Sequence, residues 1–461
     1  MTPQHRLVVL SNRGPLSFAR DSSGELRAKR GAGGLVVTLG PGVEREGALW
    51  VAAASAPDDI AAARSGLLDA EGFHMRAVEI DNGTYRAYYD VVANQTLWFC
   101  IHGLWDLPRR PRFDRRWAEA WDAFRLVNER FAAVAADFAG EGATVLVQDY
   151  QLALVPRVLS RMRPDVRVIA FMHTPWCTPE ELSVLPDAAA DELMEGLGAA
   201  GACGFHSRRW AAAFAACCLD RLGRQPEVFV APAAADADDL RAVAGSEECA
   251  SELSRLDELV GDRQVIVRVD RMELSKNVLR GFWAFDELLE ARPDLRGRVV
   301  FAAKLYPSRQ GVADYLSYAQ EVQTLADRIN ANWSTPEWTP IVIDPEDNHV
   351  AAVAALRRAD VLLVNPVRDG LNLVAKEGPL VNDRDGVLVL SRNAGAWDEL
   401  SENALGVNPF DVSGTASALA QALDMSAGEK AQRSKALRKV VESRTPLDWF
   451  DDLLGAARGG G

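Results

Sequence analysis

Residues 364–377 read VNPVRDGLNLVAKE, and the pattern of this stretch is the strongest indication of the fold. An apolar run, Asp360–Val364, leads into a glycine turn that holds Asp369, and a helix-like segment follows from about Leu371. A strand, a glycine turn and a helix start form an anion site, because free backbone N–H groups meet the positive end of the helix dipole. The carboxylates of Asp369 and Glu377 could accept hydrogen bonds from the hydroxyl groups of a sugar and a ribose. The alternative is an ordinary strand-to-helix turn capped by Asp369.

The composition is typical of a soluble globular protein with more than one domain. The chain has 461 residues, 48% of them hydrophobic and 25% charged, and a single compact core rarely extends over such a length. Its net charge of −14 argues against nucleic acid or an anionic membrane as a partner. An anionic substrate would therefore need a local cluster of Arg and Lys. The six cysteines show no CxxC spacing, which favours buried, reduced thiols.

The first residues, MTPQHRLVVLSNRG, have an apolar core of only four residues and no cleavage-like site. We expect a first strand there and not a signal peptide. The longest apolar run, Trp210–Leu219, is too short to span a bilayer, so we expect a cytoplasmic protein without a membrane partner. The oligomeric state stays open, with a homo-oligomer as one option.

Short apolar or β-branched runs alternate with Ala-, Leu- and Arg-rich helical stretches along nearly the whole chain. Apolar runs separated by helices indicate parallel strands that are covered on both faces, so we predict an α/β fold. The predicted strands are Arg6–Ser11, Ala48–Ala53, Thr96–Ile101, Thr144–Gln148, Arg167–Met172, Gly201–His206, Glu227–Ala231, Gln264–Val269, Arg298–Ala303, Pro340–Ile343, Asp360–Val364, Val387–Ser391 and Leu405–Asn408.

The strand pattern breaks off over residues 233–262, and we place a domain boundary there. Two α/β halves of similar size flank this break. Within it, Asp236 and Asp238 are spaced as in a DxD metal motif. They also stand where a helix-like stretch opens, and acidic residues in a first helical turn explain them without a metal.

Basic residues and glycines follow the first predicted strand. Arg13, in SNRGPL, stands at the carboxyl end of that strand, which is the ligand edge of a parallel sheet. Gly31, Gly33 and Gly34 precede an apolar helix-like run, so their backbone amides could approach a phosphate closely. Three basic residues nearby belong either to this phosphate site or to a solvated loop: Arg27, Lys29 and Arg30.

Aromatic residues, an aspartate and a histidine mark the same half of the chain. Tyr89 and Trp98 lie beside a predicted strand and belong either to the core or to a sugar-binding platform. Asp149 in QDYQL and His173 in MHTPWC each follow the end of a predicted strand. A single histidine is usually structural and a single aspartate could cap a helix, but a pair at successive strand ends favours a functional site.

In the second half, RVDRMELSKN follows the predicted strand Gln264–Val269 and holds Arg271 and Lys276, five residues apart. Arg271 offers a bidentate fork and Lys276 a point charge, a pairing that suits the phosphate of a leaving group. Arg309, in YPSRQ, comes soon after the strand Arg298–Ala303.

Taken in order, these motifs resemble the trehalose-6-phosphate synthases. The matching stretches are SNRGP, GGL, YY, LW, QDYQL, MHTPW, VDRMELSKN, YPSRQ, WTPI, VRDGLNLVAKE and NPFD, from about residue 7 to residue 440. The blocks RDGxNLxxKE and VDRxxxSK together are highly specific. The resemblance implies a retaining glycosyltransferase of the GT-B fold, in which two facing, doubly wound Rossmann-like domains have the active site in the interdomain cleft.

The resemblance also implies which part of the chain binds the acceptor and which part binds the donor. Residues 1–232 would form an N-terminal Rossmann-like domain that binds the acceptor, glucose 6-phosphate. Residues 233–262 would be a linker, and residues 263–440 would form a C-terminal Rossmann-like domain that binds the nucleotide-sugar donor. Residues 441–461, with Trp449 and Phe450 as anchors, would form a helix that crosses back to the first domain.

Carried over position by position, the resemblance implies three sets of site residues. The implied catalytic residues are Asp149, His173, Arg271, Lys276 and Asp369. The implied donor-binding residues are Gly34, His173, Arg271, Lys276, Asp369, Gly370, Leu371, Asn372, Leu373 and Glu377. The implied acceptor-binding residues are Arg13, Tyr89, Trp98, Asp149 and Arg309.

Within these sets, Arg271 and Lys276 would bind the donor diphosphate and take the role that a metal has in other transferases. Asp369 would hold the transferred glucose and Glu377 the ribose, while His173 would contact the glucose near its 6-hydroxyl. The resemblance thus implies an enzyme without a cofactor or a metal. The departing phosphate would itself take the proton of the acceptor hydroxyl, on the same face of the sugar.

The chain departs from the enterobacterial members of this family, which have HDYHL, LHIPFP and VDRLDYSKG where this chain has QDYQL, MHTPWC and VDRMELSKN. Members from high-GC bacteria that look like this chain are associated with GDP-glucose, so we expect GDP-glucose to be preferred over UDP-glucose. Asp344, Glu346 or Asp347 could accept hydrogen bonds from guanine, and Lys304 adds a charge near Arg309.

Two alternatives stay open at this point. A pseudo-glycosyltransferase that joins cyclitols is a known offshoot of the family, but such relatives lose parts of the acceptor pocket that this chain keeps. A non-catalytic homologue that binds sugar phosphate is the other alternative. Such homologues usually lose the Arg/Lys phosphate pair or the aspartate of RDG, and both are present here.

Overall fold

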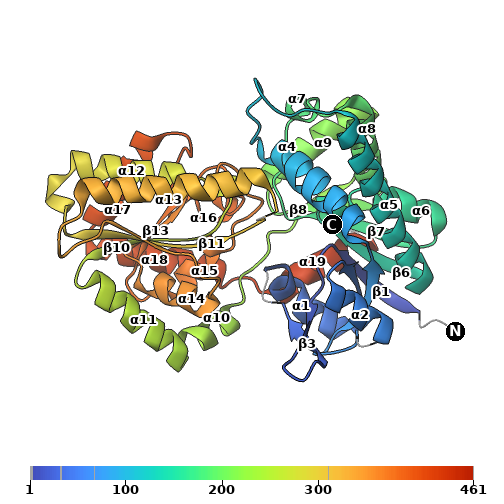
Figure 1. The fold of residues 1–461 in the computed structure, drawn as a ribbon, viewed down its shortest axis with the longest axis horizontal. Coiled ribbons are helices and arrows are strands. Elements are labelled where there is room, and N and C mark those ends of the chain that lie inside the picture. Colours follow the sequence, from blue (N-terminus) through green and yellow to red (C-terminus); the bar gives the residue numbers. More distant parts are fainter. Residues whose placement is uncertain (1–3, 32–33, 67, 310, 460–461) are drawn as a thin grey trace. The chain divides into compact units, whose positions relative to one another are not determined.

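The computed structural model describes residues 4–31, 34–66, 68–309 and 311–459, which form two compact α/β units. Unit 1 comprises Met1–Ala233 together with Pro446–Gly461, and unit 2 comprises Ala234–Thr445. Each unit contains a parallel sheet with helices packed around it (Figure 1). The predicted α/β class with parallel strands is confirmed.

The sheet of unit 1 has seven parallel strands in the order β5-β4-β1-β6-β7-β8-β9. Its strands are β1 (His5–Ser11), β4 (Leu49–Ala54), β5 (His74–Glu79), β6 (Ala139–Gln148), β7 (Arg167–Met172), β8 (Ala202–Phe205) and β9 (Val228–Val230). In β1, Val8, Val9 and Leu10 have no exposed surface. Such complete burial explains why this strand has a continuous apolar run and not an alternating pattern.

Helices and a small hairpin complete unit 1. The hairpin pairs β2 (Leu16–Arg20) with β3 (Leu26–Arg30) in antiparallel fashion. The α-helices are α1 (Gly34–Glu46), α2 (Pro57–Ser65), α3 (Asn82–Arg86), α4 (Trp98–His102), α5 (Arg115–Phe138), α6 (Val155–Met162), α7 (Pro179–Leu182), α8 (Asp187–Leu197), α9 (Arg208–Leu222) and α19 (Pro446–Arg458). A π-helix, Ala87–Leu97, joins α3 to α4, and a 3-10 turn, Tyr150–Leu152, follows β6.

The sheet of unit 2 has six parallel strands in the order β12-β11-β10-β13-β14-β15. Its strands are β10 (Gln264–Met272), β11 (Val299–Pro307), β12 (Ile341–Asp344), β13 (Val361–Val364), β14 (Val387–Ser391) and β15 (Leu405–Val407). Its α-helices are α10 (Ala237–Ala244), α11 (Glu247–Val260), α12 (Val278–Ala291), α13 (Ala313–Trp333), α14 (His349–Arg358), α15 (Val374–Val381), α16 (Trp397–Leu400), α17 (Val412–Asp424) and α18 (Ala427–Val441). Short 3-10 turns cover Leu274–Lys276 and Pro293–Leu295.

The predicted strand Thr96–Ile101 is wrong, because these residues are helical. They span the end of the π-helix and most of α4, and their apolar side chains are buried. A short apolar run fits a buried helix and a buried strand equally well, so its pattern alone could not decide between them.

Two further elements differ from the expectation. The strand β5 was not predicted: it has the polar sequence HMRAVE and lies at an edge of the sheet, where only Met75 and Val78 are buried. The stretch expected as a loop before Gly31 contains the hairpin β2–β3. The Asp21 side chain closes its turn by accepting hydrogen bonds from Ser23 and Glu25 backbone N–H groups.

The segment 233–262, expected as a linker, contains α10 and α11, and from Ala234 onward it belongs to unit 2. Both helices pack against α14. Asp236 caps α10 by accepting hydrogen bonds from the backbone N–H groups of Asp238 and Asp239. These acidic residues therefore stabilise the N-terminus of α10.

Buried apolar side chains form the interiors of the two units. All six cysteines are buried and free, as the sequence predicts. Among the described helices, none is long and apolar enough to cross a membrane.

The last helix, α19, is part of unit 1 and packs against α1 and β7. Trp449 and Phe450 on α19 have no exposed surface. Phe450 lies directly on Gly42 of α1, where an added Cβ atom would come within 2.2 Å of the phenyl ring. The absence of a side chain at Gly42 therefore allows α19 to lie this close to α1.

We predict that Gly42→Ala destabilises the protein, because the new methyl group would push Phe450 out of its packing position. A loss of about 1–3 kcal/mol in the free energy of unfolding is expected for such overpacking. Gly455 on α19 is the matched control, since no heavy atom lies within 4 Å of an added Cβ there. Gly455→Ala should stabilise by about 0.5–1 kcal/mol. Urea unfolding followed by tryptophan fluorescence measures both, and equal effects of the two substitutions would contradict the packing argument.

Candidate active site

In unit 2, charged side chains gather at the carboxyl ends of neighbouring strands. Arg271 lies near the end of β10, Lys276 ends the 3-10 turn that follows, and Asp369 comes five residues after β13. Because β10 pairs in parallel with β13, the loops that follow these strands meet at one edge of the sheet.

The Lys276 ammonium lies between two carboxylates. Its Nζ is 2.6 Å from Asp369 Oδ2 and 3.6 Å from Asp270 Oδ1. Burial lowers the pKa of Lys276, but the two carboxylates outweigh burial and raise the pKa above its ordinary value. Burial also raises the pKa of Asp270, although Arg268 and Lys276 oppose that shift. Lys276 is therefore a fixed cation in the protein without ligand.

Arg268 fixes this arrangement from inside the sheet. Its guanidinium is fully buried and donates to Asn365 Oδ1 at 2.5 Å and to the backbone carbonyl of Lys276. It also forms an ion pair with Asp270 Oδ2 at 3.0 Å. A charge without access to water is tolerated because carboxylate, amide and carbonyl oxygens surround it.

The loop between β13 and α15 holds Gly370, Leu371, Asn372 and Leu373. Helix α15 begins at Val374, which is later than the predicted start near Leu371. Asn372 takes a left-handed conformation, with φ of 76°, and its side chain donates to Asp369 Oδ2 at 3.2 Å. Asn tolerates this conformation better than most residues. The carboxylate of Asp369 is thus held by Asn372 as well as by Lys276.

Glu377 lies in the first turn of α15, and the charge of Lys276 acts on its carboxyl group. Loss of hydration raises the pKa of the Glu377 carboxyl to about 7, and the Lys276 charge offsets only part of this effect. Near neutral pH this group is therefore a mixture of the acid and the carboxylate.

Arg271 and Arg309 both contact one glutamate, Glu273. Arg271 Nη1 is 2.9 Å and Arg309 Nη1 is 3.2 Å from Glu273 Oε1. Arg309 also donates to the hydroxyl of Tyr315 at 2.8 Å. The structure therefore places Arg309, which the resemblance assigns to the acceptor, beside Arg271, which it assigns to the donor.

In unit 1, Arg13 and Tyr89 lie together beyond the end of β1. The Arg13 guanidinium carbon is 6.0 Å from the centroid of the Tyr89 ring, a cation–π distance. Tyr89 stacks on Tyr85 with ring centroids 5.2 Å apart, and Asn12 donates to the Tyr85 hydroxyl. Trp98 is 7% exposed and stacks on His102 at 3.9 Å. Its burial shows that Trp98 contributes to the core, whatever else it binds.

Asp149 and His173 lie at the ends of the adjacent strands β6 and β7. The backbone N–H of His173 donates to Asp149 Oδ1 at 3.3 Å. Asp149 has φ of 69° and ψ of 169°, a combination that is strained for any residue with a side chain. The hydrogen bond from its backbone N–H to the Phe171 carbonyl, 2.7 Å long, helps to hold this conformation. Strained backbone of this kind is concentrated at functional sites.

Hydrogen bonds engage both ring nitrogens of His173. His173 Nδ1 is 3.2 Å from His206 Nε2, and His173 Nε2 is 2.9 Å from Gln148 Oε1. His206 Nδ1 in turn lies 3.2 Å from the backbone nitrogen of Ala233 and 3.4 Å from the backbone carbonyl of Ala231. Burial lowers the pKa of His173 to about 3. His173 is therefore a neutral imidazole with both nitrogens engaged.

The glycine-rich segment of unit 1 is described in part. Gly34 is the first residue of α1, whereas Gly33 lies outside the described residues. Two basic residues of the neighbouring hairpin have acidic partners: Arg27 pairs with Asp21 at 3.0 Å and Arg30 with Glu44 at 2.9 Å. These ion pairs favour the solvated-loop interpretation for both arginines.

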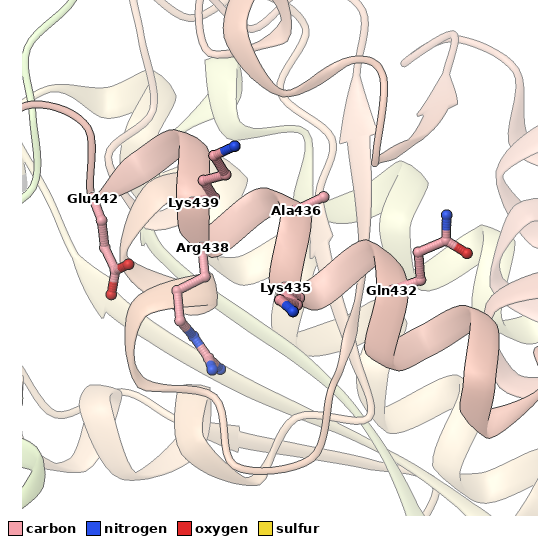
Figure 2. A pocket seen from close by; sticks show the side chains of 6 residues that line it. All are labelled: Gln432, Lys435, Ala436, Arg438, Lys439 and Glu442. Carbon is pink, nitrogen blue, oxygen red and sulfur yellow. The ribbon is translucent and has the colours of Figure 1, made fainter.

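A shallow cavity of about 420 Å³ lies along α18 and involves none of the predicted site residues. Figure 2 shows its lining side chains, which come from successive turns of α18 and from Glu442, the residue that follows this helix. They are Gln432, Lys435, Ala436, Arg438, Lys439 and Glu442. Arg438 donates to the backbone carbonyls of Pro379 and Asn382, so it serves the packing of α18 on α15. We assign no function to this cavity.

A family model described as glycosyltransferase family 20 matches residues 5–458 of the chain. The chain belongs to glycosyltransferase family 20. A trehalose-6-phosphate synthase of Mycobacterium sp. (strain KMS) is 33% identical to this family 20 chain over 485 residues, which cover 98% of the chain and 96% of the relative. A bifunctional trehalose-6-phosphate synthase/phosphatase of Thermoproteus tenax is 32% identical over 475 residues. These cover 97% of the chain but only 63% of that relative.

Solved structures of similar proteins share the fold over nearly the whole family 20 chain. An E. coli structure described as bound to UDP-2-fluoro glucose has a TM-score of 0.86, 27% identity and 99% coverage of each chain. A UDP-forming trehalose-phosphate synthase from Burkholderia xenovorans, in complex with glucose-6-phosphate, has a TM-score of 0.85, 27% identity and coverage of 98% of this chain and 100% of that one. The predicted GT-B fold is confirmed.

Several polar groups that hold the site were not predicted. They are Gln148, His206, Arg268, Asp270 and Glu273. The sequence contains a signal for Arg268 and Asp270, which are two residues apart in the apolar strand QVIVRVDRM. Side chains two residues apart in a strand lie on the same face, and buried charges there must be paired. The others depend on partners distant in sequence.

We predict that Glu377→Gln stabilises the ligand-free protein at neutral and higher pH. A carboxyl whose pKa rises on folding makes the protein less stable as pH increases from about 4.5 to about 7, because the unfolded chain loses its proton first. The advantage of the variant should be absent below pH 4.5 and reach about 3 kcal/mol above pH 7. Urea unfolding at a series of pH values measures this difference. The exposed Glu402 of the same unit is the control, and a similar pH-dependent gain in Glu402→Gln would contradict the burial argument.

Proposed function

We propose that this protein is a trehalose-6-phosphate synthase that transfers glucose from a nucleotide-glucose donor to glucose 6-phosphate with retention of configuration. The observation that carries the proposal is the buried cluster of Lys276, Asp270 and Asp369 at the strand ends of unit 2. It combines a fixed cation for a phosphate with a carboxylate for sugar hydroxyls. The relatives named trehalose-6-phosphate synthase, aligned over nearly the full chain, support the same activity.

On the donor side, Arg271 and Lys276 neutralise the negative charge that develops on the departing nucleotide phosphate. This charge grows mainly in the transition state, so preorganised cations stabilise the transition state more than the bound substrate and thereby lower the activation barrier. Asp369 accepts hydrogen bonds from the transferred glucose, next to the loop residues Gly370, Leu371, Asn372 and Leu373. Glu377 binds the ribose hydroxyls, and Gly34 offers a backbone amide to the diphosphate.

On the acceptor side, Arg13, Tyr89, Trp98 and Arg309 bind glucose 6-phosphate, and Asp149 accepts from its hydroxyls. The bond from the glucose anomeric carbon to the phosphate oxygen breaks, and the acceptor oxygen attacks from the same face. The departing phosphate takes the acceptor proton, so no protein base is needed. His173 stays neutral, and because both ring nitrogens are engaged, its backbone carbonyl is the group that meets the 6-hydroxyl.

The preference for GDP-glucose rests on an ion pair at the end of β12. Lys304 Nζ is 2.6 Å from Asp344 Oδ2, and the two residues are register partners across β11 and β12. Guanine presents two adjacent N–H donor groups beside a carbonyl oxygen, which matches a carboxylate next to an ammonium. Uracil presents a single N–H between two carbonyls and would leave part of this pair unused. Glu346 and Asp347 are the adjacent acidic residues.

The proposal is tested by turnover with glucose 6-phosphate and each nucleotide sugar. We expect α,α-trehalose 6-phosphate from GDP-glucose, with a lower kcat/KM for UDP-glucose, and proton NMR of the product reports the retained configuration. Arg271→Ala should reduce kcat about 100-fold or more, because it removes charge stabilisation in the transition state. Absence of product from both donors would refute the activity, whereas faster reaction with UDP-glucose would refute only the donor preference.

We predict that Asp344→Asn selectively weakens the use of GDP-glucose. The substitution keeps the size of the side chain but replaces an acceptor oxygen with a donor, so the ratio of kcat/KM for GDP-glucose to that for UDP-glucose should fall about 10-fold or more. Steady-state kinetics with both donors measures the ratio. Asp327→Asn, on the exposed face of α13, changes the same charge and should leave it unaltered. An unchanged ratio in Asp344→Asn would exclude this carboxylate as the guanine contact.

A further inference from the structure

Glu273 occupies an unusual position between the two arginines of the candidate site. Three donors converge on its Oε1 atom: Arg271 Nη1 at 2.9 Å, Arg309 Nη1 at 3.2 Å and the hydroxyl of Ser308 at 2.7 Å. The side chain of Glu273 has no exposed surface. Its second oxygen, Oε2, is also buried and has no hydrogen-bond partner among the described residues.

The carboxylate keeps its charge in spite of this burial. Burial alone would raise the pKa of Glu273, but Arg271, Arg309 and Lys276 outweigh it and lower the pKa to about 2. Glu273 is therefore negative throughout the pH range in which the protein would work. Two guanidinium groups that share one contact atom repel each other, and the single negative charge between them offsets that repulsion.

The three side chains differ in their access to solvent. The Arg271 side chain is 40% exposed, that of Arg309 only 8%, and Glu273 is fully enclosed. A guanidinium has five N–H donors, and the contact with Glu273 uses Nη1 of each arginine. A guanidinium therefore has donors beyond the one that contacts Glu273, and Arg271 is the more exposed of the two arginines.

The backbone around this cluster is also constrained. Arg309 has φ of 47°, in the left-handed region that residues with a side chain rarely adopt. Its guanidinium is tied to Glu273 and to the Tyr315 hydroxyl, and Ser308 beside it is tied to the same Glu273 oxygen. Glu273 thus links the end of β10 to the loop after β11 through two neighbouring residues of that loop.

We propose that Glu273 is a shared positioning residue that orients Arg271 toward the donor diphosphate and Arg309 toward the acceptor phosphate. This inference rests on the proposed function for the identity of the two substrates. One buried carboxylate then controls both phosphate contacts, so that a change in its charge weakens donor and acceptor binding together. A purely structural ion pair would affect the stability of unit 2 and neither affinity in particular.

The experiment compares Glu273→Gln and Glu273→Asp with the unaltered protein. Glu273→Gln keeps the shape but removes the charge, and we expect the KM values for donor and for glucose 6-phosphate each to rise about 10-fold or more. Calorimetry with GDP and, separately, with glucose 6-phosphate should show both affinities weakened to a similar degree. Glu273→Asp keeps the carboxylate and should recover most of the lost affinity for both ligands.

Asp360→Asn is the matched control for a loss of stability. Asp360 is also a largely buried partner of an arginine, with Oδ2 2.9 Å from Arg358 Nη1, but it stands just before β13, at the opposite end of the sheet. This variant should be less stable and yet keep both KM values. If the KM values for donor and for glucose 6-phosphate were the same in Asp360→Asn as in Glu273→Gln, the proposal would be overturned.

Two other outcomes would also overturn the shared role. Weakened binding of GDP alone, or of glucose 6-phosphate alone, would reduce Glu273 to a partner of one arginine. Failure of Glu273→Asp to recover affinity, in a variant that unfolds at the same urea concentration as the unaltered protein, would show that the negative charge is not what matters. The proposed function is judged separately, because its failure appears as absent product formation by the unaltered protein.

Discussion

The ion pair between Lys276 and Asp369 joins the loops that follow β10 and β13, and the candidate donor site depends on it. Asp270 holds the same ammonium from a second direction, and the buried Arg268 holds Asp270. A lysine taken out of water keeps its charge only if carboxylates compensate for the lost hydration. The alternation of positive and negative groups therefore maintains a cation at the sheet edge before any substrate arrives, and such preorganised charge is the most effective kind for catalysis.

Unit 1 has a different chemistry at the equivalent edge of its own sheet. His206, His173 and Gln148 form a line of hydrogen bonds between neutral side chains, and the neighbouring residue Asp149 has a strained backbone conformation. Neutral donors and acceptors with aromatic neighbours suit the hydroxyl groups of a sugar, whereas the paired charges of unit 2 suit a diphosphate. The proposed assignment of the acceptor to unit 1 and the donor to unit 2 agrees with this contrast.

Most of the fold could be predicted because buried parallel strands have an unbroken apolar sequence that few other elements share. The same rule produced the error at Thr96–Ile101, since a buried helix of short length has the same composition. It also missed β5, an edge strand whose polar residues face solvent. The segment 233–262 looked like a linker because it has no strand pattern. Packing of α10 on α14 and α15, and of α11 on α14, gives these helices their place in unit 2.

The sequence by itself determined where most strands lie along the chain and which charged residues follow them, because short motifs contain both the turn and its charged residue. Arg271, Lys276 and Asp369 could be named for this reason. Only the tertiary structure decided what holds them. Glu273 pairs with Arg309 across 36 positions of sequence, and Lys276 pairs with Asp369 across 93. Which strand ends become neighbours depends on the order β12-β11-β10-β13 of the folded sheet, and local sequence contains no record of that order.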